Sequence, residues 1–173
     1  MAKKRINTQD FILKIEKLAK SRMVSQEIVS LNEFRDFKNK IEPKMILIIE
    51  DDEAMRNSMK RIFDQAGFLV KTAADGTELS TVLDDAAPDL ILLDIGLPWI
   101  NGFELGQMLK EHKDLRKIPL IFVSGLATDE DMKKAFSIGA DDFIKKPFEI
   151  EALKKSAFTL LKINPDELNQ NDD

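Results

Sequence analysis

Acidic residues directly follow or close two short apolar runs of this 173-residue chain. Glu50, Asp51 and Asp52 come after the first run, and Asp94 closes a later one. Carboxylate oxygens are ligands that Mg²⁺ prefers, and bound Mg²⁺ keeps positions for water and phosphate oxygens. Carboxylates that lie close together repel one another, which raises a pKa unless a cation compensates. If the fold brings these residues together, they form a magnesium site.

A hydroxyl and an ammonium group follow two further strand-like runs. Ser124 ends the run at residues 120–124, and Lys146 precedes Pro147 after residues 142–145. In phosphoryl transfer, cations neutralise charge that develops on the phosphoryl oxygens, and a hydroxyl can rotate to donate to them. Each group alone has a simpler interpretation. The acidic triplet could be a solvated loop, Asp94 part of a turn, Ser124 an ordinary strand exit and Lys146 a surface lysine. Their joint placement favours Mg²⁺-assisted phosphoryl transfer.

Composition excludes several other chemistries. The chain has no cysteine and one histidine, so disulfides, thiolate zinc sites, thiol nucleophiles and histidine-rich metal sites are absent. No apolar run approaches the roughly 20 residues of a membrane-spanning helix, and polar residues follow the basic N-terminal Lys3, Lys4 and Arg5. A cytoplasmic protein is expected. The net charge of −5 argues against a protein that coats nucleic acid.

Strand and helix patterns alternate from residue 44 onward, which predicts five strand–helix units and a parallel sheet covered on both faces. The expected strands are residues 45–49, 68–72, 90–94, 120–124 and 142–145. The expected helices are residues 54–66, 77–86, 102–110, 129–137 and 149–162.

A flavodoxin-like strand order of 2-1-3-4-5 is common for five such units. It makes the first and third strands neighbours, so that Glu50, Asp51 and Asp94 face one pocket beyond the carboxyl ends of the strands. Ligands of open parallel sheets bind at this edge.

The chain divides into three predicted parts. Residues 1–43 carry 10 Lys/Arg against 6 Asp/Glu and show apolar spacings of three and four, which predict a pair of amphipathic helices. Residues 44–163 form the α/β domain. Residues 164–173 carry four acidic residues and no basic ones, and are expected to be a disordered tail.

The N-terminal helices have three alternative roles. They could dimerise or bind a partner, they could pack on the α/β domain as a stabilising element, or they could form a small DNA-binding unit. The second helix shows no dense Lys/Arg face and the expected turn glycine is missing, which argues against DNA binding.

The α/β part resembles the CheY-like receiver domain of two-component response regulators. The resemblance covers residues 44–163 and rests on four motifs: ILIIEDD at 46–52, LLDIGLP at 92–98 with the following Asn-Gly, FVSG at 122–125 and GADDFIKKPF at 139–148. It implies a signalling phosphoacceptor and not an enzyme that acts on separate substrates.

The resemblance assigns roles to individual residues. Asp94 would be the phosphoacceptor, and Glu50, Asp51 and Asp94 would hold Mg²⁺ together with the Gly96 backbone carbonyl. An aspartate that attacks phosphorus forms an acyl phosphate, which divides the transfer into two steps.

Three further roles follow from the same resemblance. Lys146 and Ser124 would contact the phosphoryl oxygens, and Ser124 and Phe143 would act as the switch. The implied phosphodonor is a histidine kinase or a phosphotransfer protein, while the downstream partner is not implied. Apart from the resemblance, a homodimer could form through residues 1–43, whose apolar helix faces must be buried, or through the face of the domain's fourth helix, fifth strand and fifth helix.

Two positions near the acceptor lack a polar side chain. Gly96 lies two residues after Asp94, and Leu126 lies two residues after Ser124. Neither can orient an attacking water, so a long-lived phospho-Asp94 is expected. Trp99, in the loop after the acceptor, should report metal or phosphoryl binding by fluorescence, unless it is merely an exposed loop aromatic.

Two other functions remain open at this stage. A Mg²⁺-dependent phosphohydrolase of the haloacid-dehalogenase type also uses an aspartyl phosphate, but it has Asp-x-Asp after its first strand, where this chain has Glu50. A degenerate receiver would signal without phosphorylation. The complete set of acidic, hydroxyl and lysine groups argues against it.

Overall fold

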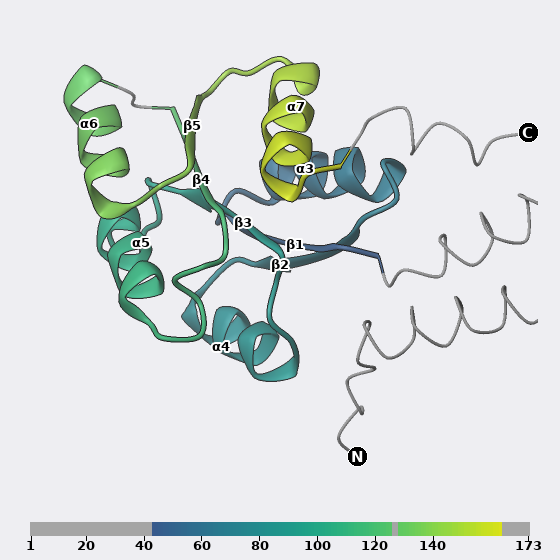
Figure 1. Cartoon of the computed structure of the whole chain (residues 1–173), viewed down its shortest axis with the longest axis horizontal. Coiled ribbons are helices and arrows are strands. Elements are labelled where there is room, and N and C mark those ends of the chain that lie inside the picture. Colours follow the sequence, from purple (N-terminus) through teal and green to yellow (C-terminus); the bar gives the residue numbers. More distant parts are fainter. Residues whose placement is uncertain (1–42, 126–127, 164–173) are drawn as a thin grey trace, which may run out of the picture. The chain divides into compact units, whose positions relative to one another are not determined.

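The computed structural model describes residues 43–125 and 128–163. Five parallel strands form one sheet in the order β2-β1-β3-β4-β5, which confirms the predicted flavodoxin-like topology (Figure 1). The strands are β1 (Met45–Ile49), β2 (Leu69–Ala73), β3 (Leu90–Asp94), β4 (Leu120–Ser124) and β5 (Asp142–Lys145). The helices between and after them are α3 (Glu53–Gln65), α4 (Gly76–Asp85), α5 (Gly102–Glu111), α6 (Asp129–Ile138) and α7 (Ile150–Leu161).

The three inner strands β1, β3 and β4 are buried along their whole length. Their side chains alternate between the two faces of the sheet, as strand geometry requires. Ile46 and Ile48 pack with α3 and α7, whereas Leu47 and Ile49 pack with α4, α5 and α6. The sheet therefore has a hydrophobic core on each face, and its continuously apolar strands are explained by burial on both sides.

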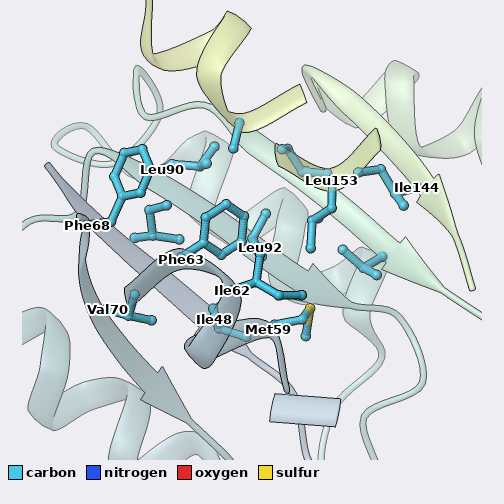
Figure 2. Packing of buried hydrophobic residues seen from close by; sticks show 14 residues of the cluster. Ile48, Met59, Ile62, Phe63, Phe68, Val70, Leu90, Leu92, Ile144 and Leu153 are labelled. Carbon is cyan, nitrogen blue, oxygen red and sulfur yellow. The ribbon is translucent and has the colours of Figure 1, made fainter. Parts of the chain in front are cut away.

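Aliphatic side chains together with Phe63 and Phe68 fill the core that α3 and α7 cover (Figure 2). The ring of Phe68 lies edge-on to Phe63 at 5.9 Å between centroids, and it stacks on Phe158 at 5.7 Å. These contacts join the end of α3 to α7. They hold both helices against the same face of the sheet.

Capping residues set where the helices begin. They move the predicted starts of α3 and α4 by one residue, whereas α5 and α6 begin at the predicted residues. Asp52 accepts a hydrogen bond from the Met55 N–H at 2.7 Å, so α3 begins at Glu53 and not at Ala54. Asp75, Asn101 and Thr128 cap α4, α5 and α6 in the same way.

The prediction for the second strand was wrong at both ends, because it placed the strand one residue too early. The Phe68 N–H donates to the Phe63 carbonyl and so belongs to the turn after α3. Gly67 makes this turn at a φ of 83°, which favours glycine. The strand consequently runs from Leu69 to Ala73.

The predicted helices of residues 1–43 lie outside the described residues except for Pro43, as do the predicted tail at residues 164–173 and Leu126. Those three predictions are not tested by the structure. None of the helices in the described ranges has the length and apolar character needed to cross a bilayer.

Candidate functional site

The strand register brings the chemically active residues to one edge of the sheet. Ile49 pairs with Leu93 in neighbouring strands, so Glu50 follows β1 at the level of Asp94 at the end of β3. On the other side of β3, Asp94 pairs with Val123, which places Ser124 one residue further along β4. The sequence pattern therefore predicted the placement of these groups correctly.

Three carboxylates converge at this edge. One oxygen each from Glu50, Asp51 and Asp94 lies within 4.8 Å of the others. Glu50 and Asp94 are buried, at 1% and 8% exposure, whereas Asp51 is exposed. Three negative groups that are so close and partly buried require a compensating cation. The cluster is thus a candidate cation site with two buried ligands and one facing solvent.

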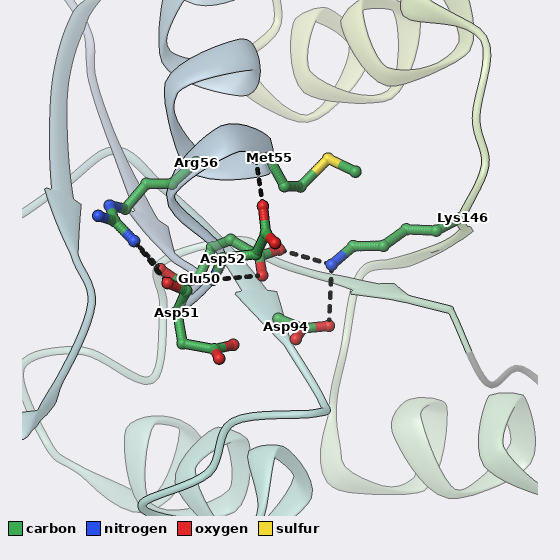
Figure 3. A network of polar contacts seen from close by, with 7 residues as sticks. All are labelled: Glu50, Asp51, Asp52, Met55, Arg56, Asp94 and Lys146. Carbon is green, nitrogen blue, oxygen red and sulfur yellow. Dashed lines mark hydrogen bonds and ion pairs between the residues drawn. The ribbon is translucent and has the colours of Figure 1, made fainter.

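Lys146 supplies positive charge to this cluster from the segment after β5 (Figure 3). Its Nζ atom lies 2.5 Å from Glu50 Oε2 and 3.2 Å from Asp94 Oδ1. Burial lowers the pKa of Lys146, but the contacts with Glu50 and Asp94 outweigh it and the pKa is raised above its ordinary value. Lys146 therefore stays fully protonated at neutral pH.

Glu50 has an unusual environment for a carboxylate. Burial raises its pKa above the ordinary value, the hydrogen bond from Lys146 opposes this, and the charge of Asp94 adds to it. Its backbone N–H donates to the Ala73 carbonyl at 3.1 Å, and its Oε1 accepts from the Asp52 N–H at 3.3 Å. Backbone and side chain are both held, which fixes the direction in which the carboxylate points.

The sequence reasoning did not identify Arg56 as part of the site. Its Nη1 donates to the carbonyls of Glu50 and Asp51, at 2.8 and 2.9 Å (Figure 3). The available signal was a basic residue near the start of a helix, where the macrodipole favours acidic ones.

Two glycines shape the loop that follows Asp94. A Cβ atom at Gly102 would lie 2.5 Å from the Asp94 carbonyl oxygen and 2.4 Å from Ile95 Cα, so the start of α5 packs directly on the end of β3. A Cβ atom at Gly96 would lie 3.3 Å from Asp94 Oδ2. The backbone of Gly96 is therefore close to the carboxylate, as expected for a residue whose carbonyl is a candidate ligand.

Ser124 and Phe143 occupy the positions expected for a hydroxyl and an aromatic near the site. Ser124 is 3% exposed, and its carbonyl accepts from the Lys146 N–H at 2.7 Å. Phe143 is half-buried on β5, opposite Phe122, and packs against the core under α4, α5 and α6. Their action as a switch remains a prediction.

Trp99 is held in place, so the alternative of an exposed loop aromatic was wrong. The indole is half-buried, its Nε1–H donates to the Ala74 carbonyl at 3.0 Å, and its ring lies against Gly76. The loop after Asp94 is thereby joined to the loop after β2.

An open hollow of about 460 Å³ lies beside Lys146. Residues at and after the start of α3 line it, namely Asp52, Ala54, Met55 and Ser58. Because Lys146 also lines it, the hollow lies next to the edge of the sheet at which the carboxylates converge.

The model of the response regulator receiver domain matches residues 46–158, which include every residue of the site described above. The chain belongs to this family. Receiver domains are signalling modules of two-component systems, so the resemblance read from the sequence is confirmed.

Curated relatives include longer regulators. The aerobic respiration control protein ArcA of Escherichia coli is 38% identical over 116 residues, which are 67% of this chain and 48% of ArcA. The DNA-binding dual master transcriptional regulator RpaA of Synechocystis is 34% identical over 117 residues, or 68% of this chain and 48% of RpaA. The matched region thus spans about half the length of these relatives.

Solved receiver structures agree in fold. The CheY-like response regulator receiver domain protein of Methanospirillum hungatei is 33% identical with a TM-score of 0.62, and the match covers 74% of this chain and 98% of that one. The receiver domain of a signal transduction histidine kinase from Syntrophus aciditrophicus is 34% identical with a TM-score of 0.63, covering 69% and 90%. Receiver domains of different proteins therefore share this fold.

Proposed function

We propose that Asp94 of this receiver accepts a phosphoryl group from the phosphohistidine of a histidine kinase or a phosphotransfer protein. The observation that carries the proposal is the convergence of Glu50, Asp51 and Asp94 within 4.8 Å, with Lys146 bound to two of them. An Asp94 oxygen attacks phosphorus, the P–N bond to the donor imidazole breaks, and the product is an aspartyl phosphate.

The residues present fit Mg²⁺. Glu50, Asp51, Asp94 and the Gly96 carbonyl all offer oxygen, which is the donor atom that Mg²⁺ selects. When bound, the ion neutralises charge on the ligand carboxylates and on the transferring phosphoryl group. The number of protein ligands leaves coordination positions for water, as the ion requires.

Lys146 and Ser124 complete the proposed reaction. Lys146 pairs with Asp94 Oδ1 at 3.2 Å. When the Asp94 oxygen becomes bonded to phosphorus, the ammonium group is close enough to stabilise the negative charge of the phosphoryl oxygens. The Ser124 hydroxyl, at the end of the neighbouring strand β4, donates to the same phosphoryl group.

Phosphorylation would be read out as a change in binding. Ser124 draws toward the phosphoryl group, Phe143 turns into the space behind it, and the face formed by α6, β5 and α7 changes. As a phenylalanine, Phe143 is held by packing alone because it has no hydroxyl. That face or residues 1–43 would then form a homodimer or bind a downstream protein in the cytoplasm, with DNA binding by this chain disfavoured by its charge of −5.

Incorporation of phosphate tests the proposal directly. Full-length protein is treated with Mg²⁺ and acetyl phosphate, and intact mass is measured against the Asp94→Asn variant. Asp52→Asn is the matched control, because Asp52 is an exposed neighbouring carboxylate and asparagine also caps helices. The expected result is one phosphoryl group in wild type and in Asp52→Asn, and none in Asp94→Asn.

The alternatives give different results in the same assay. A degenerate receiver takes up no phosphate in wild type. A phosphohydrolase of the haloacid-dehalogenase type releases phosphate continuously from phosphomonoesters, which a receiver does not. Either result in wild type overturns the proposal.

A further inference from the structure

Arg56 holds two consecutive carbonyl groups of the acidic loop. Its Nη1 donates to the oxygen of Glu50 at 2.8 Å and to that of Asp51 at 2.9 Å. Figure 3 shows Arg56 reaching the loop from one side while Lys146 reaches the carboxylates from the other. The two cations thus have separate tasks, since Lys146 contacts side chains and Arg56 contacts backbone.

The position of Arg56 in its helix is electrostatically unfavourable. It is the fourth residue of α3, and the positive end of the helix dipole disfavours a cation in the first turns. The acidic Glu53 in the first turn fits the usual preference, whereas Arg56 opposes it. The two carbonyl contacts offset this cost, and they connect α3 to the residues that carry the candidate ligands.

We infer that Arg56 is a positioning residue for the cation site, because it fixes the backbone from which Glu50 and Asp51 project their carboxylates. The inference rests on the proposed function, in which these carboxylates hold Mg²⁺. Glu50 is also held by its backbone N–H and by Lys146, whereas the exposed Asp51 depends on the loop for its direction. Loss of Arg56 therefore affects the direction of the Asp51 carboxylate most.

Removing residues that orient metal ligands weakens metal affinity by about 10- to 100-fold. Arg56→Met keeps an unbranched stem and removes the guanidinium, and we expect its Mg²⁺ dissociation constant to rise about 10-fold. Arg56→Lys keeps the charge and N–H donors but carries them on a shorter side chain, so it should recover only part of the affinity. Arg61→Met is the matched control, since Arg61 is exposed about one and a half turns further along α3.

Two measurements on the full chain test the inference. Calorimetric titration with Mg²⁺ gives the affinity, and circular dichroism checks that each variant is folded. The rate of phosphate incorporation from acetyl phosphate at increasing Mg²⁺ then separates an effect on Mg²⁺ binding from an effect on the phosphorylation step. Positioning predicts that the Mg²⁺ concentration for half-maximal rate rises about 10-fold in Arg56→Met, while the rate at saturating Mg²⁺ changes less than about twofold.

Two results would overturn the inference: wild-type Mg²⁺ affinity in a folded Arg56→Met, or an equal loss of affinity in Arg61→Met. Failure of the proposed function looks different, because wild type itself would then incorporate no phosphate at any Mg²⁺ concentration.

Discussion

The Lys146 ammonium group lies 2.5 Å from the Glu50 carboxylate and 3.2 Å from that of Asp94. The candidate phosphoacceptor therefore shares its cation with a candidate metal ligand. A metal ion that binds Glu50 changes the balance between these two contacts, so metal binding and the charge available to Asp94 are coupled.

Replacement of Lys146 should slow phosphorylation more than it weakens metal binding. Loss of one group that stabilises developing charge costs about 100-fold in rate, so Lys146→Met is expected to incorporate phosphate about 100-fold more slowly at saturating Mg²⁺. Lys145→Met is the control, because Lys145 is the exposed neighbour on β5. Time courses of intact mass measure both, and an unchanged rate in Lys146→Met would remove Lys146 from the reaction.

Ionisation of Glu50 should reduce the stability of the metal-free protein. Its pKa is raised from 4.5 in the folded state, so the folded chain binds the proton more tightly than the unfolded chain. The resulting stabilisation is complete below pH 4.5 and is lost as the pH rises through the folded pKa. Urea unfolding in EDTA across this pH range should show a decrease in the free energy of unfolding of wild type that Glu50→Gln lacks. Identical pH dependence of stability in the two proteins would contradict the raised pKa of Glu50.

Substitution of Gly102 should damage the fold at the acceptor. The Cβ atom of Gly102→Ala meets the Asp94 carbonyl oxygen at 2.5 Å, and such overpacking costs about 3 kcal/mol. Gly125→Ala is the control, since its Cβ atom meets nothing within 4 Å. Chemical unfolding should show a large decrease in the free energy of unfolding for Gly102→Ala and little change for Gly125→Ala. Equal stabilities of the two variants would refute the close packing of α5 on β3.

The phosphorylated protein should be long-lived because the position two residues after the acceptor is a glycine. A side chain at Gly96 begins 3.3 Å from Asp94 Oδ2, close enough for a polar group to orient water toward the phosphorus. Gly96→Asn is therefore expected to shorten the half-life several-fold. Loss of the phosphoryl mass after removal of acetyl phosphate measures it, and a wild-type half-life of only seconds would defeat this prediction.

Trp99 should report events at the site, because it is the one tryptophan and its loop follows Asp94 directly. Binding of Mg²⁺ or of the phosphoryl group is expected to change its emission, with a midpoint equal to the calorimetric one. Trp99→Phe removes the hydrogen bond to Ala74 and the signal together, and calorimetry then shows whether affinity depends on that bond. If the emission of wild type stays constant, Trp99 does not sense binding at the site.

The parts that the sequence predicted well are those set by hydropathy and by strand ends. Inner strands such as β3 need apolar residues on both faces, so their limits are visible in the sequence, and the strand order then brings Glu50 next to Asp94. Phe68 was misassigned because an apolar residue in a turn looks like the first residue of an exposed edge strand.

The contacts that were missed use backbone acceptors. Arg56 binds two carbonyl groups and Trp99 binds the carbonyl of Ala74, which is 25 residues earlier. Every residue carries a carbonyl group, so the identity of such an acceptor leaves no trace in the sequence. Residue types alone therefore predict which side chains do chemistry better than they predict which ones support them.

Glu50 and Lys146 are 96 positions apart in the chain, yet they meet in one ion pair. Nothing local holds them together, so their meeting requires the complete sheet from β1 to β5. A chain that unfolds therefore loses the assembled site together with the sheet. A ligand that binds only the assembled site therefore stabilises the folded chain, by an amount that rises with the logarithm of the ligand concentration above its dissociation constant.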